Sequence, residues 1–193
     1  MKGCRPLGIE EIGEVVKNFG GKYVKRDRAL FLLGVKSGFR ISELLSLRIA
    51  DVISSGKMLD RVTVARKNMK KQVEGRTVLL HPDARASLRE WVGQLDSWGV
   101  PDDHFLFLSR KGENRPMSRV HAWRILHGAF EAGGLKGKLG THSMRKTFAN
   151  RIYEALNFDL VRTQKALGHR NINSTVSYLS FREEDIDSAI LAI

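Results

Sequence analysis

Apolar residues recur every three to four positions over most of the chain, the pattern of helices with one buried face. Near the amino terminus this pattern covers residues 9–19 and 23–35, and Gly38 follows the second segment as a helix stop. Both segments are therefore predicted to be helices. Further helices are predicted, on the same pattern, for residues 41–49, 83–95 and 118–134.

One stretch, RVTVARKNMKKQVEGRTVLL, follows a different period. Val62 and Val64 alternate with polar residues before a basic centre, and Val78 and Leu80 do so after it. Alternation of this kind is typical of strands with one buried face. We therefore predict a two-stranded hairpin with a long exposed turn, and a third short strand over 104–109 (HFLFLS).

The carboxy-terminal third is predicted to be helical. In residues 141–156 an apolar residue recurs every four positions from Met144 onward, so His142 and Arg145 start the polar side of that helix. Shorter helices are predicted for residues 160–167, 172–179 and 182–193. The chain as a whole is predicted to be mainly α (α+β), with one small antiparallel hairpin.

The net charge of the chain indicates which class of partner it binds. Lysine and arginine number 33 against 21 acidic residues, giving a formal net charge of +12 and a pI near 10.1. Such an excess favours a polyanionic partner, nucleic acid before an anionic membrane surface. The longest apolar run, ALFLLGV, is too short to cross a bilayer, and the first residues lack the apolar core of a signal peptide. We expect a cytoplasmic protein with no membrane contact.

Metal and disulfide chemistry find little support in the sequence. The single cysteine, Cys4, excludes an internal disulfide and a cysteine-rich zinc site. The six histidines show neither an HExxH motif nor a Cys/His ligand spacing. No metal or other cofactor is expected; a metal site assembled from distant parts of the chain is the alternative.

The stretch GTHSMRKTFAN gathers hydrogen-bond donors and positive charge where a helix should begin. His142, Arg145 and Lys146 occur there without any carboxylate. Arg40, in SGFRISELLSL, lies between a glycine stop and a helix start, where the helix dipole opposes a cation. Arg40 is either a surface arginine or a partner for Arg145, since two guanidinium forks can bind the oxygens of one phosphate.

The basic centre of the hairpin offers several lysines that could donate a proton. Lys67, Lys70 and Lys71 all qualify, and Lys67 is preferred. Together with Arg66 they could instead form a solvated turn that touches the DNA backbone.

A histidine and a tyrosine lie close together in ALGHRNINSTVSYLS. His169 follows Gly168, which ends one predicted helix, and Tyr178 comes nine residues later within the next. Tyrosine in an amphipathic helix is usually a core or boundary residue with a hydrogen-bonded hydroxyl. A functional role for Tyr178 therefore depends on the other motifs.

Four motifs occur in a fixed order: Arg40 in GFRISELLSL, HSMR over 142–145, LGH ending at His169, and Tyr178. This set resembles the tyrosine recombinase (phage integrase) family over residues 7–182. The resemblance implies the family's helical catalytic domain with a small antiparallel sheet.

The resemblance also implies roles for individual residues. Arg40, His142, Arg145 and His169 correspond to the family's phosphate-binding and acid/base residues, and Tyr178 to its nucleophile. The implied reaction cleaves and rejoins DNA through a 3′-phosphotyrosine and needs neither ATP nor a metal.

Supporting roles follow in the same way. A hairpin lysine, preferably Lys67, corresponds to the general acid, and Glu43 to an acidic residue that orients the site. The residues expected to contact DNA around these positions are Arg66, Lys70, Lys71, Lys146 and Arg170.

Two features depart from the family's pattern. A helix is predicted almost from Met1, so we expect a single catalytic domain over 1–193 without the separate amino-terminal core-binding domain that most members carry. The short fimbrial-switch recombinases are similar in this respect. The hairpin turn is longer than many and lacks the proline that commonly follows it, which leaves the identity of the lysine open.

The implied partners are double-stranded DNA, further copies of the chain in a tetrameric synaptic complex, and an accessory DNA-binding protein. The segment 182–193 could pack on a neighbouring protomer or fold back on its own core. Two other functions remain as alternatives. One is a non-catalytic or accessory DNA-binding protein that retains the fold. The other is a type IB topoisomerase, against which His142 argues because that family usually has lysine there.

Overall fold

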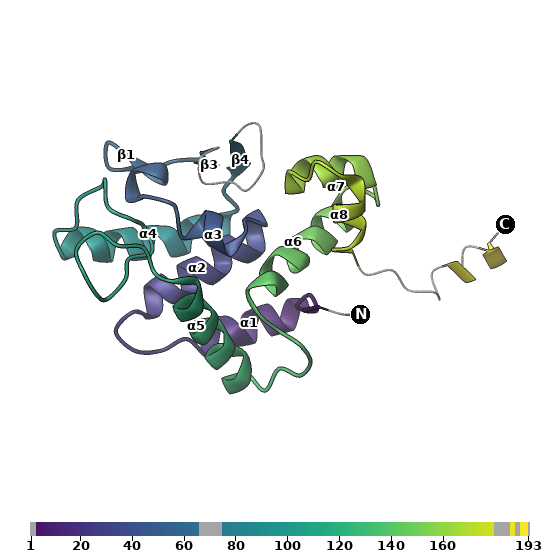
Figure 1. The fold of residues 1–193 in the computed structure, drawn as a ribbon, viewed down its shortest axis with the longest axis horizontal. Coiled ribbons are helices and arrows are strands. Elements are labelled where there is room, and N and C mark those ends of the chain that lie inside the picture. The colour runs from purple at the N-terminus through teal and green to yellow at the C-terminus, as the bar shows by residue number, and fades with distance from the viewer. Residues whose placement is uncertain (1–2, 66–74, 180–185, 188–189, 193) are drawn as a thin grey trace. The chain divides into compact units, whose positions relative to one another are not determined.

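The computed structural model describes residues 3–65, 75–179, 186–187 and 190–192, and helices make up most of it (Figure 1). The helices are α1 (Ile9–Lys17), α2 (Val24–Ser37), α3 (Ile41–Leu44), the 3-10 helix η1 (Ile49–Asp51), α4 (Pro82–Ser97), α5 (Arg119–Ala132), α6 (Thr141–Ala155), α7 (Leu160–Leu167) and α8 (Ile172–Val176). The strands are β1 (Ile53–Ser54), β2 (Lys57–Met58), β3 (Arg61–Val64) and β4 (Arg76–Leu79). The predicted fold class, mainly helical with a small antiparallel sheet, is confirmed.

The chain divides into two compact units, residues 1–148 and 149–193. The first unit contains α1 to α5 and the four strands, and the second contains α7 and α8; α6 contributes residues to both. Within the described residues, no helix is long and apolar enough to cross a membrane.

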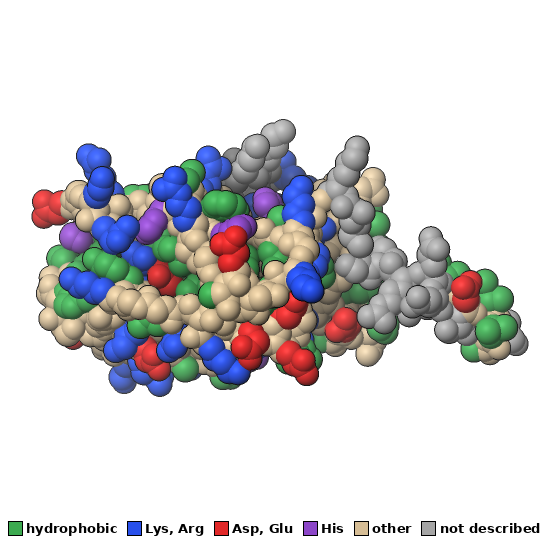
Figure 2. All heavy atoms as spheres, turned by 90° about the horizontal axis from the view of Figure 1, so that it is seen from below, with side chains coloured by type: hydrophobic (Ala, Val, Ile, Leu, Met, Phe, Trp, Pro, Cys, Tyr) green, Lys and Arg blue, Asp and Glu red, His purple; other side chains and the backbone are tan. Residues whose placement is uncertain are grey.

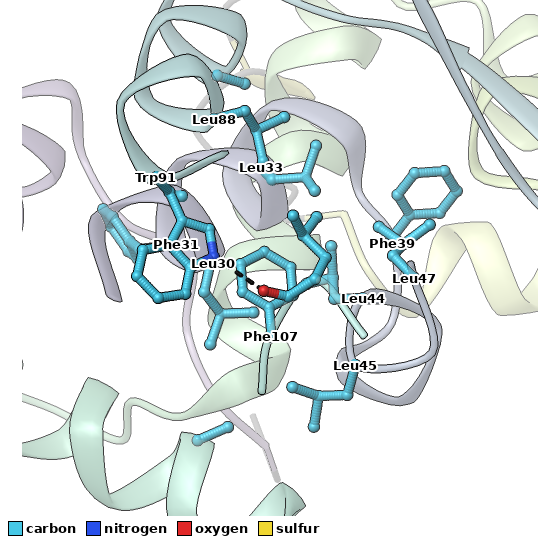
Figure 3. Packing of buried hydrophobic residues seen from close by; sticks show 14 of the residues in the cluster. Leu30, Phe31, Leu33, Phe39, Leu44, Leu45, Leu47, Leu88, Trp91 and Phe107 are labelled. Carbon is cyan, nitrogen blue, oxygen red and sulfur yellow. Dashed lines mark hydrogen bonds between the residues drawn. The ribbon is translucent and has the colours of Figure 1, made fainter. Parts of the chain in front are cut away.

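Helix α2 forms the centre of the first unit. Its residues Leu30, Phe31 and Leu33 are fully buried and pack near Leu88 and Trp91 of α4 (Figure 3). The indole nitrogen of Trp91 donates a hydrogen bond of 2.8 Å to the carbonyl of Leu106, so this large buried side chain leaves its polar atom satisfied. The apolar pattern of the sequence thus becomes one continuous core.

Helix α2 ends where the sequence predicts. Gly38 adopts the left-handed conformation, with φ of +63°, and its N–H bonds to the carbonyl of Gly34 at 3.1 Å. A side chain at Gly38 would collide with Phe148, since an added Cβ would lie 2.3 Å from the ring atom Cδ1. The turn that follows carries Arg40 into α3.

The two strands of the predicted basic hairpin are present. Strands β3 and β4 pair antiparallel with Val62 opposite Val78, and Val62 and Val64 are buried while their neighbours Arg61 and Thr63 are exposed. A second hairpin, β1 with β2, was not predicted. Its two-residue turn, Ser55 and Gly56, has positive φ at both positions, as tight hairpin turns require.

Three predicted elements differ from the structure. The helix expected over 41–49 is only the short α3, followed by a turn and η1. Residues 104–109 form no strand; they make single bridges, Arg48 with Phe105 and Leu108 with Pro116. Their apolar run reflects burial of Leu106 and Phe107 rather than sheet pairing.

The third difference concerns the helix expected over 172–179. Helix α8 ends at Val176, and Tyr178 follows in a tighter turn in which its N–H bonds to the carbonyl of Thr175 at 2.9 Å. In the same unit, α7 is capped by Asp159 and ends at Gly168, as predicted. The expected helix over 182–193 lies mostly outside the described residues.

Candidate active site

The turn between α2 and α3 holds Arg40 against a buried carboxylate. One oxygen of Glu43 accepts the backbone N–H of Arg40 at 2.7 Å, and the other accepts its guanidinium Nη1 at 2.7 Å. Glu43 is 1% exposed, whereas the Arg40 side chain is 28% exposed. Glu43 offsets the unfavourable effect of the helix dipole on Arg40 and leaves part of the guanidinium open to solvent.

Arg145 reaches the same carboxylate from α6. Its side chain is 1% exposed, Nη1 donates a hydrogen bond to the carbonyl of Gly38, and Nη1 lies 4.0 Å from Oε2 of Glu43. Two arginines distant in sequence therefore meet around one carboxylate, as the bidentate phosphate hypothesis requires.

His142 lies one helical turn before Arg145 at the start of α6. Its surroundings lower the pKa of the imidazole, first by partial desolvation and then through the nearby cations of Arg145, Arg40 and Lys146. A lowered pKa keeps His142 neutral at physiological pH. The ring can then either donate or accept a proton at a phosphate.

A third arginine belongs to this group and was not predicted. Arg76, the first residue of β4, is 8% exposed, and its Nη2 donates a hydrogen bond of 2.6 Å to the carbonyl of Ser37. Burial and the neighbouring Arg145 lower the pKa of Arg76 to about 9. The signal for it was present in the sequence, because Arg76 shares the alternation of Val78 and Leu80.

In the second unit, His169 and Tyr178 lie side by side. Their ring centroids are 5.1 Å apart, His169 is 8% exposed, and its Nδ1 is 3.0 Å from the hydroxyl of Thr175. The side-chain amide of Asn150 donates to the carbonyl of Tyr178 at 3.2 Å. Thr175 and Asn150, which the sequence analysis did not single out, thus hold the histidine ring and the tyrosine backbone.

The remaining predicted residues give less information. Arg66, Lys67, Lys70 and Lys71 lie outside the described residues, and Arg170 is exposed on the second unit. Among the described residues, no three histidine, cysteine, aspartate or glutamate side chains gather as metal ligands. Figure 2 shows lysine and arginine side chains at many places on the visible face, with acidic side chains among them.

Comparison with known proteins places the chain in a family. Residues 7–184 match the model of the phage integrase family. The chain is 30% identical to the probable integrase/recombinase YoeC of Bacillus subtilis over 181 residues, which is 94% of this chain and 91% of YoeC. It is 31% identical over 158 residues to the type 1 fimbriae regulatory protein FimE of Escherichia coli, covering 79% of this chain and 73% of FimE.

A solved structure agrees with the sequence matches. The site-specific recombinase XerH, in a pre-cleavage complex with its difH substrate, superimposes with a TM-score of 0.73 at 25% identity. The match covers 98% of this chain but 55% of the XerH chain, so the chain spans little more than half of that relative. The resemblance expected from Arg40, HSMR, LGH and Tyr178 is confirmed: the chain belongs to the phage integrase family, the family of the tyrosine recombinases.

Proposed function

We propose that the chain is the catalytic part of a site-specific recombinase that cleaves and rejoins double-stranded DNA through a covalent 3′-phosphotyrosine at Tyr178. The observation that carries this proposal is the meeting of Arg40 and Arg145 around the buried Glu43, with His142 one turn away. This arrangement has the chemistry of an oxyanion site, because it fixes several cationic donors in place before a substrate arrives.

The first step is recognition of the scissile phosphodiester. Arg40 and Arg145 bind its non-bridging oxygens, and His142 donates a further hydrogen bond. As Tyr178 attacks, negative charge grows on those oxygens, and donors that are already in position stabilise it without reorganisation.

The second step is transfer of the strand. The Tyr178 hydroxyl loses its proton, with neutral His142 as an acceptor, and its oxygen bonds to phosphorus while the bond from phosphorus to the 5′ oxygen breaks. His169 hydrogen-bonds a phosphate oxygen. A hairpin lysine, preferably Lys67, protonates the leaving 5′ oxygen, since an alkoxide is a poor leaving group.

The covalent phosphotyrosine conserves the energy of the broken bond. A 5′ hydroxyl from another strand can therefore reverse the step, and the reaction needs neither ATP nor a metal. We propose a cytoplasmic protein that assembles on DNA with further copies of itself, aided by an accessory DNA-binding protein where affinity is low. A non-catalytic DNA-binding protein of the same fold is the function that an experiment must separate from this one.

Covalent trapping tests the proposal. Nicked suicide duplexes that tile the DNA flanking the gene are incubated with the protein, and adducts are resolved on denaturing gels. The wild-type chain is expected to form an adduct and Tyr178→Phe none, while both bind the duplex equally, because phenylalanine keeps the ring and lacks the nucleophile. Tyr153→Phe, which alters another tyrosine of the second unit, serves as the control and should behave as wild type.

The outcomes are distinct. Adducts that persist in Tyr178→Phe would show that another residue is the nucleophile. Binding of the duplexes by the wild-type chain without any adduct would identify a DNA-binding protein instead. Relaxation of plasmids that lack the trapped sequence would point to a topoisomerase.

A further inference from the structure

We propose that Arg76 is a third arginine of the phosphate-binding site, a positioning residue that fixes the α2–α3 turn and adds positive charge where the scissile phosphate is bound. The inference rests on the proposed function and extends it to a residue outside the predicted catalytic set. Four observations carry it: its backbone contact, its aromatic contacts, its burial and its neighbouring charges.

The backbone contact places Arg76 at the end of α2. Its Nη2 donates to the carbonyl of Ser37 at 2.6 Å, and Arg145 donates to the next carbonyl, that of Gly38. The last carbonyls of a helix lack partners within the helix and carry partial negative charge, so cations are favoured there. Two arginines therefore hold two successive carbonyls, immediately before the turn that carries Arg40.

Aromatic rings keep the guanidinium of Arg76 in place. It lies 4.9 Å from the ring centre of Phe39 and 5.9 Å from that of Phe148. Phe39 precedes Arg40 in the turn, and Phe148 follows Arg145 on α6. Stacking of this kind is directional and suits arginine better than lysine.

The burial of Arg76 is difficult to explain by stability alone. A buried charge carries a desolvation cost, and an apolar side chain of similar volume often serves stability as well or better. Arg76 instead lies within electrostatic range of Arg145 and Arg40, with Glu43 as the buried carboxylate among them. Among the described residues, three guanidinium cations thus lie near the carboxylate of Glu43.

Repulsion among these three guanidinium groups is unfavourable in the free protein and is offset when a phosphate binds beside them. A phosphodiester carries one negative charge, and attack by Tyr178 adds another on its non-bridging oxygens. The field of Arg76 acts on that charge through the low-dielectric interior, while its hydrogen bond keeps the Ser37–Gly38 backbone, and with it Arg40 and Arg145, in position.

Two substitutions separate charge from packing. Arg76→Lys keeps the charge, whereas Arg76→Gln keeps an N–H donor for the Ser37 carbonyl and removes the charge. Arg85→Gln is the matched control, because Arg85 also donates to a backbone carbonyl, that of Met58 at 3.0 Å, but its charge is paired with Asp60 at 2.7 Å. Each variant is tested at saturating concentration on the nicked duplex that traps the wild-type chain, and its thermal midpoint is measured.

The same duplex is also made with a methylphosphonate at the scissile position, which lacks one negative charge. We expect Arg76→Gln to slow adduct formation roughly 10- to 100-fold on the phosphodiester, the range for residues that hold reacting groups in place. On the methylphosphonate its rate should approach that of the wild-type chain. Arg76→Lys keeps the charge but loses the planar stacking, so any loss of rate should be equal on the two duplexes, and Arg85→Gln should lose nothing on either.

Equal loss of rate by Arg76→Gln on both duplexes would assign Arg76 to packing and overturn the inference, and so would full activity on the phosphodiester. Should Arg76→Gln be unfolded, Arg76→Met, which also removes the charge but keeps a long side chain, is measured on the same two duplexes and judged by the same criterion. Absence of a wild-type adduct would contradict the proposed function itself and remove the inference with it.

Discussion

His142 shows how strongly the chemistry of one residue depends on its neighbours. Its pKa is lowered by partial desolvation and by Arg145, Arg40 and Lys146. A histidine whose pKa is lower in the folded than in the unfolded chain binds its proton less readily when folded. Its contribution to stability is therefore present above the ordinary pKa, about 6.5, and is lost as the pH falls below that value.

Removing one of these cations should raise the pKa of His142. We expect Lys146→Gln to shift the ring titration toward the ordinary value, because one repulsive charge is gone, and Lys138→Gln, an exposed lysine before the helix, to leave it unchanged. The titration is followed by NMR of the ring protons, assigned with His142→Asn. Equal titration in the two glutamine variants would contradict the electrostatic explanation.

Many of the individual residues of the candidate site could be predicted from the sequence. The residues of the four motifs were chosen from their types and from the family resemblance, because binding a phosphate needs cationic donors and cleaving the strand needs a nucleophile. Arg76 was missed because its burial depends on the strand it begins, although its place in the alternation with Val78 marked it as inward-facing. The catalytic roles of the motif residues and of the hairpin lysine remain predictions.

The end of α2 is the part of the fold that most strictly limits which residue can occupy it. Gly38 combines a left-handed backbone with close contact to Phe148, and its carbonyl accepts the hydrogen bond of Arg145. A side chain at this position would adopt an unfavourable backbone conformation and also collide with the ring of Phe148. The close contact of Gly38 with Phe148 ties the turn to α6 and leaves little freedom for the position of Arg40.

Gly38→Ala should therefore cost more stability than an alanine in an equally left-handed but open turn. We expect roughly 1–2 kcal/mol from the backbone conformation alone, with a further loss from the collision with Phe148. Gly99→Ala is the control, since Gly99 has φ of +69° and no atom within 4 Å of an added Cβ. Urea denaturation measures both; equal losses would show that Phe148 moves aside without cost.

The long helices were predictable because their apolar period extends over several turns, and the hairpin because its valines alternate. The stretch HFLFLS was misread as a strand because short apolar runs have no period of their own. Its backbone is satisfied by separate partners, including Leu47, whose carbonyl accepts the N–H of Leu106 at 2.8 Å. Such partners are tertiary and leave no local pattern.

For the molecule as a whole, the excess of positive charge should govern DNA affinity. If six to ten phosphates are contacted, binding should weaken by about 10³- to 10⁵-fold between 50 and 200 mM salt. Arg170→Gln should reduce the slope of log affinity against log salt by about one, because one phosphate contact is lost. Arg162→Gln, which alters an arginine already paired with Asp159 at 3.4 Å, should leave the slope unchanged.

Fluorescence anisotropy with a duplex over a range of salt concentrations gives the slope. An unchanged slope in Arg170→Gln would remove that residue from the DNA-contacting set. The overall charge was the earliest indication of a DNA partner in the sequence. The expectation of a single catalytic domain over 1–193 stays a prediction, because composition and periodicity say little about how units are joined.

Arg76 and Arg145 donate hydrogen bonds to main-chain carbonyls at the end of α2, and this affects which mutations the protein can tolerate during evolution. Every amino acid carries a carbonyl, so a mutation at Ser37 alters local side-chain contacts but cannot delete the acceptor of Arg76. Mutations that disrupt this turn are therefore expected mainly at the two arginines and at Gly38. A lineage under pressure to change its DNA site could vary much of the surrounding sequence while the scaffold of this turn persists.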